Sequence, residues 1–170
     1  MGTLNLGSVS LSSNGTAFSN SAATWSDAPA GTVIQVVAEH GNTAFSAQTT
    51  SYVQTPVTCT ITPRVSTSNI LVRQCVSSWE GSGAYGYRQV RATGGYTNND
   101  CGTYGDYYNY GSAAYGTRIH EVLVTNHNTT SAIVFTCWGK GGNGNTWYWP
   151  NNFNGTMSHK YIMVCTEIAT

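Results

Sequence analysis

The chain has seven carboxylates that could carry acid–base chemistry. A glycosidase needs two of them about 5–9.5 Å apart across the scissile bond. Asp100 and Asp106 share one segment and could converge, but acids among Asn and Gly residues are typical turn residues. In Glu39-His40 and His120-Glu121, adjacent side chains of a strand would point to opposite faces, so neither pair is a ready dyad. We therefore predict that the protein is not an enzyme and has no catalytic residue.

The histidines and cysteines do not form a metal-binding pattern. His120 and His127 are not at metal-ligand spacing on a predicted strand, and the chain contains no Cys-x-x-Cys pair. Neither a phosphate-binding loop nor a G-x-S-x-G nucleophile motif is present. The sequence therefore predicts no metal site and no cofactor.

The five cysteines are an odd number, so at least one thiol is free or pairs between chains. Cys101 is expected in a loop, and a Cys75–Cys137 disulfide remains open. The odd count, together with the lack of a visible secretion signal in residues 1–10, favours assembly in a reducing cytoplasm. The other cysteines lie in apolar, strand-like runs and are expected to be small buried hydrophobes: Cys59, Cys75, Cys137 and Cys165.

Charge is scarce and balanced. Charged residues are 8% of the chain, against about 25% in a typical protein. Lys and Arg number 7 and Asp and Glu number 7, so no electrostatic footprint for nucleic acid or an anionic membrane exists. No apolar run approaches the roughly 20 residues that span a bilayer. We therefore expect neither a nucleic-acid partner nor a membrane partner.

The chain length of 170 residues suits one domain. Residues 1–31 are predicted to form a short extended N-terminal arm and hinge, followed by a domain at 32–170. At least seven apolar runs predict strands in it, and short connections with turn dipeptides join them. The predicted fold is therefore all-β, a single β-sandwich of jelly-roll or Greek-key type. The predicted strands are 33–38, 57–62, 70–76, 85–90, 119–125, 132–138 and 161–168.

Two segments, 93–117 and 139–157, are predicted to be long loops rich in aromatic residues, Gly and Asn. Such mixtures are typical of recognition surfaces, because Tyr offers a large contact area at low entropic cost. Two alternatives stay open: these aromatics pack within the domain or against a neighbouring copy, or they bind an external ligand. The candidate residues are Tyr104, Tyr107, Tyr108, Tyr110, Trp147, Tyr148 and Trp149.

Several motifs resemble those of small virion proteins from marine and cyanobacterial tailed phages. The most specific is Ile61-Thr62-Pro63 followed by Ser66-Thr67-Ser68-Asn69-Ile70-Leu71-Val72. These motifs are spread along the chain from Met1 to Ala169; they are typical of strands and turns, and indicate no binding site. The others are Met1-Gly2-Thr3-Leu4, Pro29–Val37, Gln48–Val53, Tyr87–Arg91 and Glu167-Ile168-Ala169.

The resemblance implies a tail-fibre or virion-decoration protein, usually a β-sandwich homotrimer, assembled in the host cytoplasm and located on the virion. The chain has no long shaft, which favours a capsid decoration (cement) protein whose arm lies across neighbouring capsid subunits. Its partners would be copies of itself and the major capsid protein or tail and fibre proteins. The arm anchors would be Leu4, Leu6 and Trp25.

The alternative is a tail-fibre or knob adhesin that binds a host surface glycan through the Tyr- and Trp-rich loops. Weaker alternatives are a cellular lectin and a polysaccharide-degrading enzyme.

Overall fold

The computed structural model describes residues 3–6, 9–13, 18–19, 25, 28–43, 45–80, 86–106, 114–141, 147–148 and 161–170. Of residues 3–19, 77–80, 105–106, 114–118 and 147–148, only the backbone is described.

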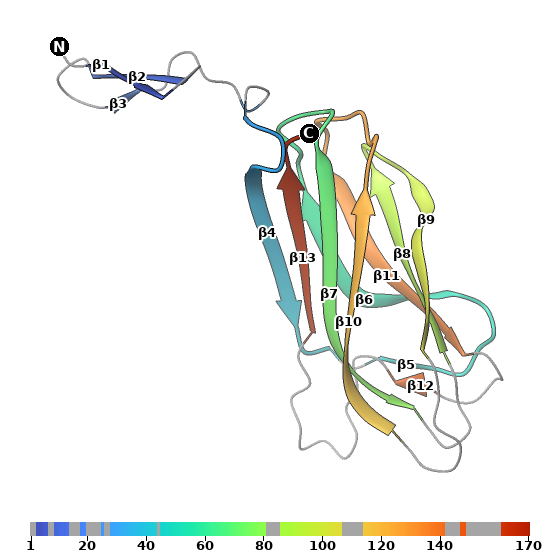
Figure 1. The fold of residues 1–170 in the computed structure, drawn as a ribbon. Helices are drawn as coiled ribbons and strands as arrows, with labels where there is room; N and C mark the ends of the chain where they lie inside the picture. Colours follow the sequence, from blue (N-terminus) through green and yellow to red (C-terminus); the bar gives the residue numbers. More distant parts are fainter. Residues whose placement is uncertain are drawn as a thin grey trace.

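Two four-stranded antiparallel sheets face each other (Figure 1). Sheet I has the order β4 (Val33–Gly41), β13 (Tyr161–Ile168), β7 (Asn69–Glu80) and β10 (Ala114–Val124). Sheet II has the order β6 (Val53–Ile61), β11 (Ile133–Gly141), β8 (Gly86–Gly94) and β9 (Asn98–Asp106). Two short strands, β5 (Ser46–Ala47) and β12 (Trp147–Tyr148), extend sheet I at the far end of β7. The prediction of an all-β sandwich is confirmed.

Consecutive strands mostly alternate between the sheets, and β8–β9 is the one hairpin among these eight strands whose two members pair with each other. Most connections among these eight strands therefore cross from one sheet of the sandwich to the other. All described pairings in both sheets are antiparallel.

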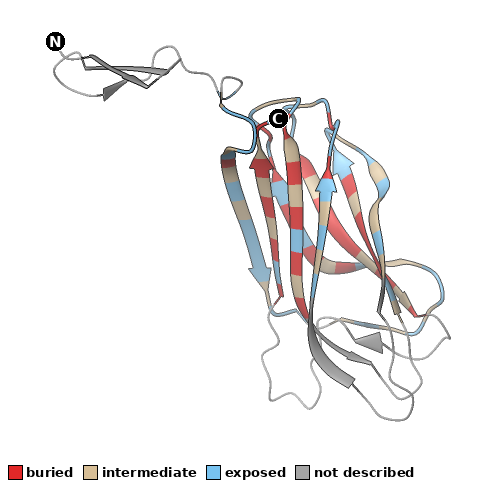
Figure 2. Ribbon diagram, viewed as in Figure 1, coloured by how far each residue is buried: buried red, intermediate tan, exposed pale blue. Residues whose placement is uncertain are grey.

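The core lies between the sheets, and along strands such as β6, β7 and β13 the buried positions alternate with more exposed ones (Figure 2). On β6, Val57, Cys59 and Ile61 are buried, as the alternation predicted. Met163 on β13 and Phe135 on β11 are also fully buried. Each such side chain contributes about 1.5–3 kcal/mol through burial, which holds the two sheets together.

The structure corrects the prediction of a loop over 93–117. Residues 98–106 form β9, which pairs with β8, and Cys101 lies on this strand instead of in a loop. The β8–β9 connection begins at Gly94, whose φ of 95° favours glycine. A Cβ there would also lie 2.6 Å from the Ala132 carbonyl oxygen. The sequence of β9 has almost no apolar pattern, so its pairing with β8 is what makes this segment a strand.

The N-terminal arm contains three strands that the sequence did not predict: β1 (Thr3–Leu6), β2 (Val9–Ser13) and β3 (Phe18–Ser19). They form an antiparallel sheet whose described pairings are only with one another. In Figure 1 this sheet lies beyond the end of the sandwich where β4 begins.

The predicted hinge at 28–31 is a turn attached to the C-terminus. Gly31 N donates to the Ala169 carbonyl, and Ala169 N donates to the Thr32 carbonyl, each at 2.9 Å. Gly31 has a φ of 86°, which again favours glycine. The arm therefore leaves the sandwich at a defined point next to Ala169.

Among the described residues, no helix is long and apolar enough to cross a membrane.

Candidate functional site: a groove on the outer face of sheet II

Both edge strands of sheet II carry a bulge. On β6, the three residues between Gln54 and Thr58 face Cys137 alone; on β9, the three residues between Asn98 and Gly102 face Arg91 alone. The two bulges are at the same level, because Thr136 pairs with Arg91 and Cys137 pairs with Val90 on the central strands. Bulges bend a strand and redirect its side chains, and they are common next to functional sites.

The bulge of β6 is built around Pro56. Proline has no N–H to donate, so it suits an edge strand or a bulge. The Thr55 hydroxyl donates to the Cys137 carbonyl at 2.9 Å and accepts from Val57 N at 3.3 Å. The Tyr161 hydroxyl donates to the Pro56 carbonyl at 3.1 Å. These bonds replace the ladder bonds that the bulge removes.

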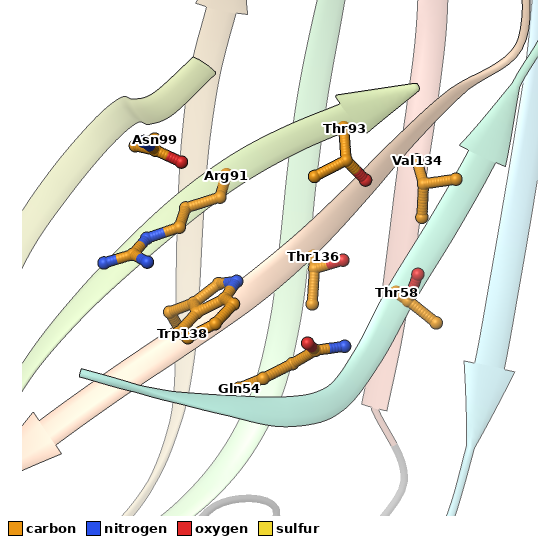
Figure 3. A pocket seen from close by; sticks show the side chains of 8 residues that line it. All are labelled: Gln54, Thr58, Arg91, Thr93, Asn99, Val134, Thr136 and Trp138. Carbon is orange, nitrogen blue, oxygen red and sulfur yellow. The ribbon is translucent and has the colours of Figure 1, made fainter. Parts of the chain in front are cut away.

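Between the bulges, the outer face of sheet II contains a groove of about 280 Å³ (Figure 3). Arg91 and Trp138 lie at one end of it, while Thr93 and Val134 lie at the other. Hydroxyl and amide groups dominate the rest of the lining. The lining residues are Gln54 and Thr58 on β6, Arg91 and Thr93 on β8, Asn99 on β9, and Val134, Thr136 and Trp138 on β11.

Arg91 is held in place by its neighbours. Its guanidinium carbon lies 4.1 Å from the ring centroid of Trp138 and 5.4 Å from that of Tyr52. Its Nε donates to Gln89 Oε1 at 2.6 Å, and Gln89 Nε2 donates to the Thr103 hydroxyl at 3.1 Å. Within the described part of the chain, its two Nη atoms make no hydrogen bond. They are donors that the stacked geometry orients in advance.

A second cation lies beside the groove on the same face. Lys140 Nζ is 4.7 Å from the Tyr52 ring centroid and 5.1 Å from that of Tyr87. Burial, as the largest cause, raises the pKa of the Tyr52 hydroxyl, so this ring stays neutral beside the cations at neutral pH. Neither Lys140 nor Arg91 forms an ion pair with a carboxylate of the described residues.

The predicted loop aromatics divide into three groups. Tyr104 lies on β9, where its hydroxyl donates to the Glu121 carbonyl and its ring lies 4.7 Å from the His120 ring. It thus packs within its own domain. The backbone of Trp147 and Tyr148 forms β12, which pairs with β5 and β7. Outside the described residues lie Tyr107, Tyr108, Tyr110 and Trp149.

Of the predicted arm anchors, Leu4 and Leu6 lie on β1. Trp25 is 45% exposed, and the Arg64 guanidinium lies 4.9 Å from its ring centroid. Trp25 therefore contacts the domain while it keeps nearly half of its surface open.

The backbone positions of Asp100 and Asp106 are six residues apart on β9, which is about 20 Å along a regular strand and more than the separation in a glycosidase pair. The Asp100 side chain accepts a hydrogen bond from the Thr103 hydroxyl at 2.9 Å. Glu121 forms an ion pair with Arg73 on the outer face of sheet I, whereas His120 contacts the buried Arg88. The expected separation of His120 and Glu121 onto opposite faces is confirmed.

Ser68, His127 and Glu167 form a buried cluster that no motif of the sequence indicated. Ser68 Oγ lies 2.7 Å from Glu167 Oε1 and 3.2 Å from His127 Nε2. His127 Nδ1 accepts from Thr129 N at 3.4 Å, so Nε2 carries the proton and donates to Ser68. The serine thus lies between the other two, donates to Glu167 and accepts from His127, so the histidine does not stand between the serine and the acid. The cluster joins two loops to β13 and is not a catalytic triad.

All five cysteines are free thiols. Cys59, Cys137 and Cys165 are buried as expected, and Cys75 is only partly buried. A Cys75–Cys137 disulfide is not formed, because Cys137 is fully buried in the core on β11 while Cys75 alternates with the buried Val76 on β7. Burial raises the pKa of the Cys101 thiol to about 11, so it is unreactive at neutral pH.

Among the described residues, no cluster of His, Cys, Asp or Glu could hold a metal ion.

Comparison with models of known protein families gave no match, and comparison with curated proteins gave no significant match.

Proposed function

We propose that the protein is a non-enzymatic structural protein on the surface of a bacteriophage virion, specifically a homotrimeric capsid decoration protein that docks through its N-terminal arm. The observation that carries the proposal is the outer face of sheet I, which exposes apolar side chains over three of its strands. Exposed apolar patches on a small domain are typical of protein–protein contacts.

The outer face of sheet I has apolar rows set by the strand register. Ile162 on β13 and Ile119 on β10 flank Cys75 on β7, and they are 44% and 62% exposed. Four register positions further along, Leu123 lies opposite Leu71 and is 53% exposed. Such a face supports contact between copies, because burial of these side chains would remove apolar surface from water.

The low charge of the outer face of sheet I also favours association between copies. The described ion pair on this face, Arg73 with Glu121, is neutral as a unit and lies between the apolar rows. The whole chain has no net charge. Copies that meet through this face therefore face little like-charge repulsion.

The N-terminal arm supports docking. Its three strands pair with one another and with no described strand of the sandwich, so its edges remain for a capsid partner. Trp25 adds an exposed aromatic surface close to the root of the arm.

Immunogold labelling of intact particles tests the location. We expect label spread over the head of phage particles that carry this protein. Label confined to the tail or fibre tips would contradict capsid decoration, and particles without any label would contradict a virion role.

The second candidate is a tail-fibre or knob adhesin that binds a host surface glycan. The groove on sheet II favours it, because hydroxyl, amide and aromatic groups gather there on an open face. Binding to cells or polysaccharide without binding to capsids would support this candidate.

A further inference from the structure

We propose that the groove on the outer face of sheet II binds a saccharide unit that carries a carboxylate, with Arg91 as the carboxylate ligand and Trp138 and the threonines as contacts for the ring. The inference does not rest on capsid decoration. It rests on the adhesin candidate and gives that candidate a binding site on the face of sheet II instead of in the Tyr- and Trp-rich loops.

The groove is a built feature of the sheet. Two edge strands deviate at the same level, and each inserts two extra residues beside the central strands. Thr55, Pro56 and Tyr161 fix one of these bulges by hydrogen bonds. With a volume of about 280 Å³, the groove is near the lower limit of about 300 Å³ for small-molecule sites. It therefore suits one or two sugar rings and not a large ligand.

The lining matches a sugar in its chemistry. Three threonine hydroxyls, at 58, 93 and 136, offer both donors and acceptors, as do the amides of Gln54 and Asn99. Val134 and the Trp138 indole add apolar surface for the C–H groups of a ring. An extended peptide would need an open strand edge, whereas the groove lies on the face of the sheet.

Arg91 specifies an acidic sugar. Its stacking on Trp138 and its bond to Gln89 orient the guanidinium, and its two Nη atoms have no hydrogen-bond partner among the described residues. A planar guanidinium binds a carboxylate through two parallel hydrogen bonds. Lys140 adds positive charge nearby and forms no ion pair with a described carboxylate. A uronic acid supplies both the carboxylate and the ring.

Calorimetric titration of the full chain tests the site. The probes are trimers of galacturonic, glucuronic and mannuronic acid, each beside the neutral trimer of the parent hexose. We expect at least one acidic trimer to bind, and to bind more weakly as salt increases, because the charges are near the surface. Arg91→Gln should weaken it by roughly 10- to 100-fold, the range for a hydrogen bond to a charged group.

A matched control uses a second guanidinium that lies over an indole among the described residues. Arg64 lies over Trp25, away from the groove, so Arg64→Gln makes the same change of charge and should leave binding unchanged. Because Arg91→Gln could disturb the sheet, Thr93→Val gives a second variant at an exposed position of the groove. We expect it to weaken binding by roughly 2- to 10-fold while the melting temperature stays constant.

Three outcomes would overturn the inference. One is no binding of any acidic trimer at millimolar concentration. Another is equal binding of the acidic and neutral trimers, and the third is an equal loss in the Arg91 and Arg64 variants. These outcomes concern the isolated protein, so they are distinct from a failure of immunogold labelling, which concerns only its place on the particle.

Discussion

At the scale of single residues, Glu167 on β13 joins β4 to the loop between β6 and β7. Its side chain is 0% exposed and accepts hydrogen bonds from Arg64 N, Val65 N, the Ser68 hydroxyl and Gln35 Nε2. Burial alone would raise the pKa of this carboxyl, but the four donors outweigh it and lower the pKa below its ordinary value of 4.5. Glu167 is therefore ionised in the folded protein at neutral pH.

Glu167 should make the protein sensitive to acid. Because its folded pKa is below the unfolded value, its stabilisation is complete above pH 4.5 and decreases as pH falls from there through the lower folded pKa. Glu167→Gln should reduce the free energy of unfolding at pH 7 by about 1.5–3 kcal/mol and flatten this acid slope. Urea titrations between pH 3 and 7 would measure both effects.

Glu121→Gln is the matched control, because Glu121 is exposed and pairs with Arg73 on the surface. Exposed ion pairs contribute about 0–1 kcal/mol, so this variant should keep the wild-type acid slope. If both variants behaved alike, the buried network would not be the source of the slope.

At the scale of elements, prediction succeeded where strands bury one face. The alternation of Val57, Cys59 and Ile61 and the run at 161–168 indicated β6 and β13 directly, because burial against the other sheet selects that pattern. The strand β9 was missed, because Asn, Asp and Gly dominate its sequence and only pairing with β8 makes it a strand.

The groove could not have been predicted for a related reason. Its residues come from four strands. The register of β8 with β11 places Arg91 near Trp138, and the two bulges shape the edge strands on either side. No periodicity of the sequence encodes a bulge. Pro56 within an apolar run was the one visible signal, because proline inside a strand indicates an edge or a bulge.

The outer face of sheet I gives a prediction about assembly. If copies associate through it, the double variant Ile119→Ser and Leu123→Ser should weaken association at least tenfold, or about 1.4 kcal/mol. The fold should persist, because exposed substitutions usually change stability by about 0.5 kcal/mol or less. Sedimentation velocity over a range of concentrations would measure the oligomer. Val134→Ser on sheet II is the control, and an oligomer indifferent to the double variant would contradict this interface.

At the scale of the whole molecule, no described strand of the arm pairs with a described strand of the sandwich. Deletion of residues 1–27 removes β1, β2 and β3 but keeps the bonds of Gly31 and Thr32 with Ala169. The truncated domain should therefore stay folded, as circular dichroism would show, and it should lose binding to capsids in co-sedimentation. A truncated domain that still decorates capsids would contradict docking through the arm.

The bonds of Ala169 with Gly31 and Thr32 also have a practical consequence for protein engineering. They bring the start and the end of the sandwich to the same end of the molecule, so a short linker could join Thr170 to Thr32 in a circular permutant. A tag or cargo fused after Thr170 would emerge beside the arm, on the side that faces the particle in the decoration proposal. Display of a foreign peptide would be better placed at the opposite end of the sandwich, where β4 ends at Gly41.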